Sequence, residues 1–128
     1  MASISIDNLA DEITRSVQEY TEDVSEAIEQ KVDEVADSVL NEVVTNHGYK
    51  DRSGKYTKGF KKTKQDKAGK TRRVIWNKKD YRRVHLLEFG HAKRGGGRVQ
   101  AYPHLRPAYD KFGAKLPDEI KRIIRNGG

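Results

Sequence analysis

The side chains most able to do chemistry are concentrated between His85 and Ala108, where the sequence reads HLLEFGHAKRGGGRVQAYPHLRPA. His85 and Glu88 are spaced three residues apart, so they could share one helical face as metal ligands. However, the pair of histidines four residues apart that zinc hydrolases use is missing, and the basic surroundings disfavour a bound cation. We therefore predict no metal site, and we expect His91 and His104 to cap or bridge a turn.

The glycine-rich stretch AKRGGGR in the same segment could cradle a phosphate. A Walker loop requires Gly, four residues and then Gly-Lys-Ser/Thr. A dinucleotide fingerprint requires a strand before the glycines and a helix directly after them. Neither pattern is present in this stretch. A flexible turn is the simpler interpretation, with nonspecific contact of Arg94 and Arg98 to a phosphate backbone as the alternative. No elbow for a nucleophile is found either, so we predict no catalytic residue, no cofactor and no enzymatic activity.

The composition indicates one domain over residues 1–128 that would be only marginally stable alone. Apolar residues make up 34% of the chain and charged residues 35%, so we expect part of the stability to come from partners or self-assembly. The chain has no cysteine, no apolar run near the roughly 20 residues that span a bilayer, and no signal-peptide pattern at its N-terminus. We therefore expect an intracellular protein without membrane contact.

The net charge of +7 hides a division into an acidic and a basic part. Residues 1–48 carry 12 acidic and two basic side chains, for a net charge of −10, whereas residues 49–128 carry seven acidic and 24 basic side chains, for +17. The two parts could pair with each other, within or between subunits. Alternatively, the basic part faces a polyanion while the acidic part faces elsewhere.

The acidic part has the hydrophobic spacing of one long amphipathic helix, with Asp7 as the expected N-cap and Gly48 as a left-handed stop. Such a helix would be on the order of 55–60 Å long, which exceeds the length of a small domain. It could lie on its own domain with a kink or break, or part of it could pack on neighbouring subunits. Its apolar face is formed by Leu9, Ile13, Val17, Tyr20, Val24, Ile28, Val32, Val35, Val39 and Val43.

Residues 53–64 and 71–78 have the pattern of two strands, joined by the turn QDKAGK with Asp66 early and Gly69 late. Pairing these strands places like charges opposite each other, so we expect the hairpin to be more stable beside an anion. Three interpretations stay open: a solvated ribbon, a surface that faces DNA or its channel, and a surface that docks on an acidic protein, such as a neighbour's acidic helix. The candidate contact residues are Lys58, Lys61, Lys62, Lys64, Lys67, Lys70, Arg72 and Arg73.

The sequence after residue 79 predicts a short helix over 80–89, with Asp80 as its cap. It further predicts a loop over 92–97, a short strand over 98–102 and a C-terminal helical region from Pro103. A break in that last region is expected over 113–117, because Pro117 interrupts its apolar face. The fold class is therefore α+β: a long N-terminal helix, a small antiparallel sheet with a basic hairpin, a short helix and a C-terminal helix.

The segment 81–108 resembles the Hong Kong 97 phage gene-product-ten-like proteins, which are tail-component, neck or tail-completion proteins of long-tailed double-stranded-DNA bacteriophages. The resemblance rests on an apolar-Glu-aromatic-Gly element, a variable loop and a Pro-x-Leu-x-Pro-Ala element, and Ser53-Gly54-Lys55-Tyr56 is similar to a Ser/Thr-Gly element upstream. The matching residues are Tyr81, Leu87, Glu88, Phe89, Gly90, His91, Pro103, His104, Leu105, Pro107 and Ala108.

This motif also makes sense as a structural joint. Glu88 can pair with Arg94, Arg98 or Arg106, or accept backbone N–H bonds, and Gly90 lets the helix stop sharply. The two prolines fix the entry to the last helix, so the loop between would project where a neighbour could contact it. The expected subunit-contact residues are Glu88, Gly90, His91, Arg94, Arg98, Pro103, His104 and Pro107.

The resemblance implies a structural virion protein made in the host bacterial cytoplasm and placed at the head–tail junction. It further implies assembly as a ring, with six subunits as the working number, around the channel that DNA passes through. Its partners would be connector, head-closure or tail proteins, with transient nonspecific contact to DNA through the basic hairpin. The alternative is a nonspecific nucleic-acid-binding module that acts outside any virion, which predicts salt-sensitive DNA binding by the monomer.

Overall fold

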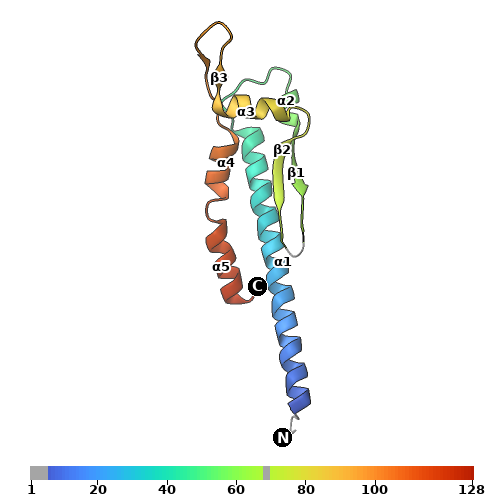
Figure 1. Ribbon diagram of the computed structural model, residues 1–128. Coiled ribbons are helices and arrows are strands. Elements are labelled where there is room, and N and C mark those ends of the chain that lie inside the picture. The colour runs from blue at the N-terminus through green and yellow to red at the C-terminus, as the bar shows by residue number, and fades with distance from the viewer. Residues whose placement is uncertain (1–5, 68–69) are drawn as a thin grey trace.

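One unbroken helix, α1 (Ile6–Thr45), forms the axis of the molecule (Figure 1). The computed structural model describes residues 6–67 and 70–128. The 40 residues of α1 correspond to about 60 Å at ~1.5 Å per residue. The kink or break that one of the two interpretations required is absent, because the helix contains neither proline nor glycine. The rest of the chain covers only the C-terminal part of α1, and the N-terminal part projects (Figure 1).

Both predicted ends of α1 need correction. The helix begins before Asp7, so this residue lies in the first turn instead of preceding it. The helix ends at Thr45, close to the expected stop, but Gly48 does not have a positive φ. Instead, the backbone N–H of Asn46 continues the helical pattern by donating to the carbonyl of Glu42 (2.8 Å).

The predicted first strand is a short helix followed by a shorter strand. Residues 55–58 form α2 (Lys55–Lys58), which Gly54 precedes with a φ of 73°. The strand β1 (Phe60–Lys64) then pairs with β2 (Arg73–Asn77), so only the second half of the prediction for 53–64 is confirmed. Tyr56 and Phe60 are four residues apart, which is the spacing of a helical face, and the prediction of a strand over 55–58 overlooked it.

The basic hairpin itself is confirmed. β1 and β2 pair antiparallel, from Phe60 opposite Asn77 to Lys64 opposite Arg73. Like charges therefore do face each other at the far end of the hairpin, as the sequence predicts. The turn position predicted for Gly69 lies outside the described residues.

The short helix is α3 (Tyr81–Phe89), which crosses the end of the molecule opposite to the N-terminus (Figure 1). Asp80 occupies the N-cap position, as predicted, but its side chain makes no capping hydrogen bond. The strand predicted over 98–102 is shorter: β4 (Arg98–Val99) pairs antiparallel with β3 (His91–Ala92), a strand that the sequence pattern did not indicate. These two strands form a second, projecting hairpin (Figure 1).

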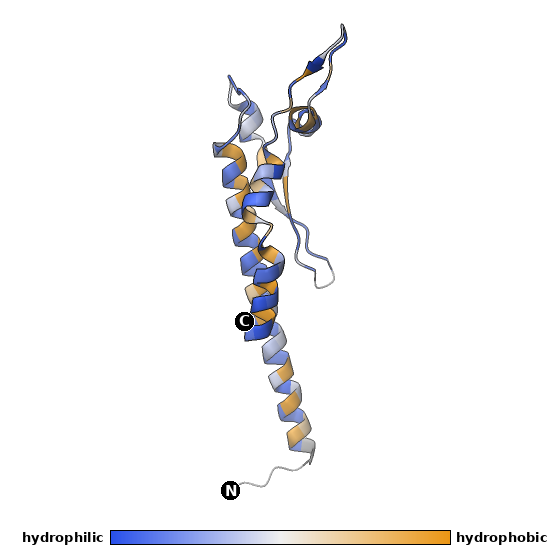
Figure 2. Ribbon diagram, turned by 90° about the vertical axis from the view of Figure 1, so that its left-hand side faces the viewer, coloured by the Kyte–Doolittle hydropathy of each residue, from blue (hydrophilic) through white to orange (hydrophobic). Residues whose placement is uncertain are grey.

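The C-terminal region is divided as predicted, although its first helix begins at Leu105 and not at Pro103. α4 (Leu105–Phe112) and α5 (Leu116–Asn126) are separated at Gly113, and Pro117 lies in the first turn of α5. The two helices pack along one side of α1 and run antiparallel to it, and β1–β2 contacts α1 on the other side (Figure 1). The hydrophobic face of α1 thus lies between two neighbours over its C-terminal half (Figure 2).

The core is small and lies where the C-terminal end of α1 meets α2, α4 and the base of the β1–β2 hairpin. Partly buried side chains from α3 and α4 complete it, including Leu87, Leu105 and Phe112. Such a small core fits the low apolar content of the chain. The buried apolar residues of the cluster are Val39, Val43, Tyr49, Tyr56, Phe60 and Ala108.

Candidate functional site

The buried carboxylate of Glu88 joins the end of α3 to the start of α4. Its oxygens accept hydrogen bonds from the backbone N–H groups of His104 (2.9 Å), Leu105 (3.0 Å) and Arg106 (3.1 Å). These N–H groups begin α4 and have no partner inside the helix, so Glu88 caps α4 from a distant part of the sequence. Of the partners predicted for Glu88, the structure selects the backbone.

The pKa of Glu88 reflects two opposing effects. Burial disfavours the charged carboxylate and raises the pKa, but the three N–H donors outweigh this effect. The pKa of Glu88 is therefore held below its usual range. An ionised carboxylate in this position supplies acceptors for the N–H donors and also interacts favourably with the positive end of the α4 dipole.

His104 occupies the centre of the same joint, with 1% of its surface exposed. Its Nδ1 lies 2.8 Å from the carbonyl oxygen of Tyr102 and 3.1 Å from Oε1 of Glu88, and its Nε2 lies 2.8 Å from the hydroxyl of Tyr56. Because Nδ1 faces acceptors, we assign the proton to it, and the Tyr56 hydroxyl then donates to Nε2. Burial raises the pKa of Tyr56, which keeps this hydroxyl protonated. His104 thus bridges the turn, as predicted, and also ties α4 to α2.

Gly90 and Pro107 have the backbone roles that the sequence predicts. Gly90 ends α3 with a φ of 70°, and a Cβ there would lie 2.6 Å from the carbonyl oxygen of Val99. Pro107 is the third residue of α4, where a missing N–H costs no helical hydrogen bond. Pro103 is exposed and directly precedes the His104 N-cap position.

The remaining motif residues, His91, Arg94 and Arg98, lie on the projecting β3–β4 hairpin. Arg94 is exposed, and Arg98 donates to the carbonyl of Phe89 at the base of the hairpin (3.4 Å). Gly96 and Gly97, both with positive φ, form the turn at its tip. These arginines are therefore separate from the Glu88 carboxylate, and their predicted role in subunit contact stays a prediction.

The acidic and basic parts of the chain pair with each other along α1 and the β1–β2 hairpin. Arg73, whose side chain is only 5% exposed, contacts Asp33 (2.9 Å), Asp66 (2.8 Å) and Glu29 (3.4 Å). Lys62 adds contacts to Asp33 (2.8 Å) and Asp37, and Lys64 contacts Glu29 (3.1 Å). We call this group of ion pairs the α1–hairpin seam.

The seam explains how like charges are tolerated in the hairpin. Hydrogen bonds from Lys62 and Arg73 lower the pKa of Asp33, so it stays ionised between them. The anion that the sequence analysis expected beside the hairpin is therefore the chain's own acidic helix. Pairing within the subunit occupies three of the eight basic residues proposed to contact DNA or an acidic partner.

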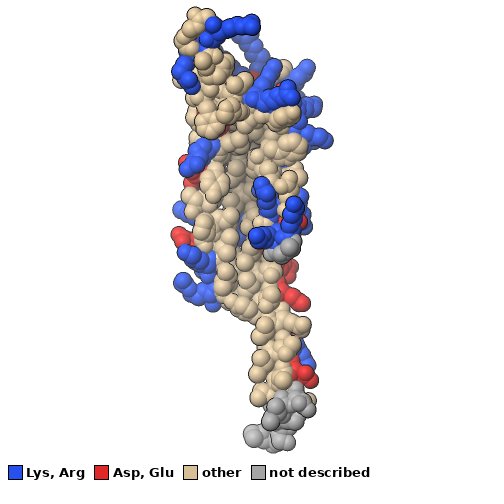
Figure 3. Space-filling view, viewed as in Figure 1, with Lys and Arg blue, Asp and Glu red and all other residues tan. Residues whose placement is uncertain are grey.

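The other five, among them Lys61 and Arg72, are exposed. None of these five takes part in an ion pair between described residues. Figure 3 shows Lys and Arg side chains gathered near the tip of the β1–β2 hairpin and around the α3 end of the molecule. The hairpin thus has one neutralised face and a set of free cations, which are Lys58, Lys61, Lys67, Lys70 and Arg72.

Two residues that the sequence analysis did not single out stabilise this region. Asn77 is 1% exposed; its amide donates to the carbonyl of Tyr56 (2.7 Å), and its Oδ1 accepts from the N–H of Asp80 (2.8 Å). Asp51 accepts from the N–H groups of Gly54 (3.0 Å) and Thr57 (2.7 Å) and thereby fixes α2. An asparagine at a strand end and an aspartate near a glycine are common turn signals, so the sequence offered little to distinguish them.

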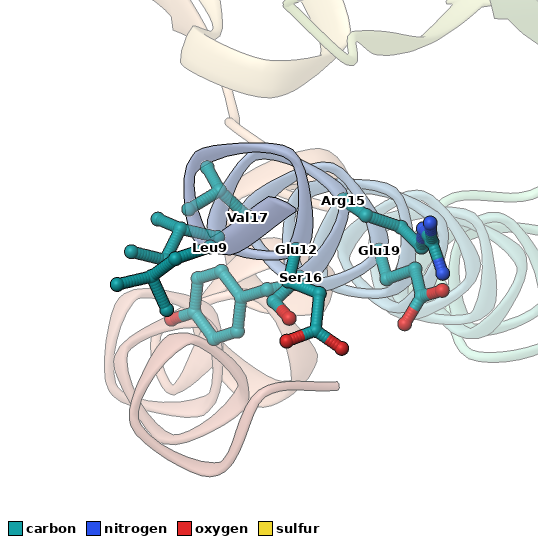
Figure 4. A pocket seen from close by; sticks show the side chains of 8 residues that line it. Leu9, Glu12, Arg15, Ser16, Val17 and Glu19 are labelled. Carbon is teal, nitrogen blue, oxygen red and sulfur yellow. The ribbon is translucent and has the colours of Figure 1, made fainter. Parts of the chain in front are cut away.

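The N-terminal part of α1 presents an apolar stripe that the rest of the described structure leaves largely uncovered. Leu9, Ile13, Val17 and Tyr20 are each between 45% and 57% exposed. Figure 4 shows Leu9 and Val17 on one side of the helix, with Arg15 and Glu19 on the other. Only Tyr20 reaches α5, where its hydroxyl donates to the carbonyl of Ile124.

Within the described residues, no three His, Asp or Glu side chains are placed to share a metal ion, and no helix has the length and hydropathy to cross a bilayer. Two of the chemically capable residues of the segment 85–108, Glu88 and His104, hold helices together. The arrangement defines an elongated α+β protein with a rigid joint at one end and an uncovered helix at the other.

Comparison with known proteins assigns this architecture to a family. The chain matches the family model described as "Bacteriophage HK97-gp10, putative tail-component" over residues 11–90. The chain therefore belongs to the HK97-gp10-like family of bacteriophage tail components, as its motif predicts. No significant match is found among curated proteins or among solved structures.

Proposed function

We propose that this tail component acts at the head–tail junction of a tailed double-stranded-DNA phage, in the neck or in tail completion. Copies of the chain would assemble as a ring around the DNA channel, with six subunits as the working number. The observation that carries the proposal is the family match over residues 11–90. Connector, head-closure or tail proteins would be its neighbours in the virion, and we propose no enzymatic role.

The surfaces of the chain support an assembly role. The stripe on α1 and the large side chains of Tyr81, Phe89 and Tyr109 are all exposed, which is costly for a protein that stays alone in water. The five free cations near the β1–β2 hairpin could neutralise phosphates without reading a sequence, as a channel lining requires. Subunit association would cover the first set of side chains and could leave the second facing DNA.

Two experiments test the proposal. Light scattering and negative-stain electron microscopy of the purified full-length protein should show closed rings of one subunit number. A stop codon early in the gene of the parent phage should yield filled heads and separate tails, and complementation from a plasmid should restore joined particles. Normal infectious particles without the protein would overturn the proposal.

The free cations also favour the alternative of a DNA-binding module outside the virion, so the same material should be used to test it. That alternative predicts a monomer of 14.6 kDa whose affinity for DNA falls steeply as the salt concentration rises. It also predicts that the protein is absent from purified phage particles. Presence in particles together with ring formation would decide for the structural role.

A further inference from the structure

The projecting part of α1 combines an apolar stripe with strongly acidic flanks. We define the arm as residues 8–26, all of which are exposed except the half-buried Val24. It carries six carboxylates and one basic side chain, and no ion pair between described residues involves any of the six. The six carboxylates are Asp11, Glu12, Glu19, Glu22, Asp23 and Glu26.

The charge of the arm restricts what can cover its stripe. Two arms that paired along their stripes would bring five net negative charges on each helix together, which is unfavourable. A suitable partner is instead an apolar groove with basic side chains at its rim, and it must accept a helix with anchors at the spacing of Leu9, Ile13, Val17 and Tyr20.

The chain carries such a groove between α3 and α4. The groove has a volume of about 600 Å³ and is lined by the exposed side chains of Tyr81, Phe89 and Tyr109. Arg106 lies in its wall, and Arg82, on α3, packs over the Tyr81 ring at 5.7 Å. We call it the α3–α4 groove.

The surroundings of the α3–α4 groove suit an acidic helix. Glu88 in the groove lining is used by the α4 backbone, and Arg106 already pairs with Asp110 (3.1 Å). Arg82, beside the groove, takes part in no ion pair between described residues. Lys93 and Arg94 extend from the β3–β4 hairpin that follows α3. The arm stripe spans roughly 16 Å from Leu9 to Tyr20, comparable with the ~13 Å length of α3.

The arm and the α3–α4 groove lie at opposite ends of the elongated molecule, so one chain cannot bring them together (Figure 1). We propose that the arm of one copy of this chain docks in the α3–α4 groove of the next copy. The contact is head-to-tail, so it generates either a closed ring or an open filament. The inference rests on the proposed function, because it names the contact that would build the ring.

The test uses two full-length variants that each remove one side of the contact. Ile13→Asp with Val17→Asp alters the arm, and Phe89→Asp alters the groove; all three positions are exposed, and circular dichroism should show that both variants fold. Each variant alone should have the mass of a single subunit in light scattering. Mixed together, they should form pairs and nothing larger, because only one intact contact is possible per pair.

Matched substitutions control for added charge. Gln18 lies on the arm but outside the stripe, about 100° around the helix from Val17, and Leu86 lies on α3 but lines a different hollow. The two control substitutions are Gln18→Asp and Leu86→Asp. Both should leave the mass of the assembly unchanged. A groove variant that stays assembled while the arm variant dissociates would overturn the proposal and indicate that the arm binds elsewhere.

Other outcomes separate this inference from the proposed function. If both variants form rings like the original protein, the docking is wrong and the ring stands. If the original protein forms an open-ended series of oligomers that both variants abolish, the docking stands and the ring is wrong. A protein that is a single subunit at every concentration would overturn both.

Discussion

At the scale of single residues, the segment 85–108 uses side chains familiar from active sites to hold three elements together. Glu88 accepts three backbone hydrogen bonds, and His104 connects Tyr102 to the buried Tyr56. Each of these groups is satisfied by a neighbour inside the fold, so they have a structural role. Because buried charged groups depend on their partners, single substitutions here should have large effects.

Glu88→Gln should destabilise the protein by about 2–4 kcal/mol at neutral pH, because an amide places an NH₂ group against backbone donors. The lowered pKa of Glu88 means that its contribution is present above its ordinary value of 4.5 and is lost as the pH falls through the lower folded-state value. Urea unfolding at several pH values should therefore show that the difference in free energy of unfolding between the original protein and the variant shrinks as the pH falls through the folded-state pKa of Glu88. A constant difference down to low pH would contradict this role.

Gly90→Ala should cost about 2–4 kcal/mol, because the new Cβ would meet the Val99 carbonyl oxygen at 2.6 Å in a backbone with a φ of 70°. Gly95→Ala is the matched control, since nothing lies within 4 Å of a Cβ at that position. Thermal unfolding of both variants checks the prediction. Equal stability of the two would show that the backbone around Gly90 can adjust.

At the scale of elements, α1 serves as an anion for the hairpin as well as an axis for the fold. Arg73 connects Asp33 and Glu29 on α1 with Asp66 in the hairpin turn. An isolated surface ion pair contributes little, but a nearly buried guanidinium with three carboxylates forms a network. The seam therefore sets how the hairpin lies on α1.

Arg73→Met should lower the Tm by roughly 3–6 °C, because it leaves three carboxylates close together without their shared cation. Arg72→Met removes the same charge from an exposed position that forms no ion pair with any described residue, and it should leave the Tm nearly unchanged. Scanning calorimetry in low salt and in ~0.5 M NaCl should show a smaller difference at the higher salt. Equal Tm values for the two variants would contradict the stabilising role of the α1–hairpin seam.

At the scale of the whole molecule, pairing within the chain leaves charge of one sign at each end. The arm remains acidic, and the α3 end and hairpin tip remain basic (Figure 3). A head-to-tail contact between copies would neutralise part of the negative charge of the arm and part of the positive charge at the α3 end. The cations of the β1–β2 hairpin would then remain available to a polyanion. The low apolar content of the chain led us to expect partners or self-assembly, and the structure has specific uncovered surfaces where such contacts could form.

Lys61→Gln combined with Lys67→Gln and Lys70→Gln should weaken binding of the assembled protein to random-sequence duplex DNA. Each lost phosphate contact should reduce the slope of log affinity against log salt by about 0.9. Lys115→Gln with Lys121→Gln and Arg122→Gln changes the charge equally on the α5 side and should have a smaller effect. Fluorescence anisotropy over a salt series measures both, and equal slopes for the two variants would contradict a DNA-facing hairpin.

The sequence by itself determined the features that depend on neighbours along the chain. The spacing of apolar residues gave the long helix, Pro117 located the break between α4 and α5, and the motif around Gly90 identified the joint and the family. It failed where alternatives were locally equivalent, as in the helical turn of α2. These signals are short-range, because helical periodicity and turn chemistry act within a few residues.

Only the tertiary structure decided which distant groups meet. It selected the α4 backbone over three arginines as the partner of Glu88, across 16 residues, and it placed Arg73 on Asp33 across 40 residues. Sequence spacing does not encode such pairings, because they depend on how the helices and the hairpin pack. The same packing covers one half of the apolar face of α1 and leaves the stripe from Leu9 to Tyr20 exposed.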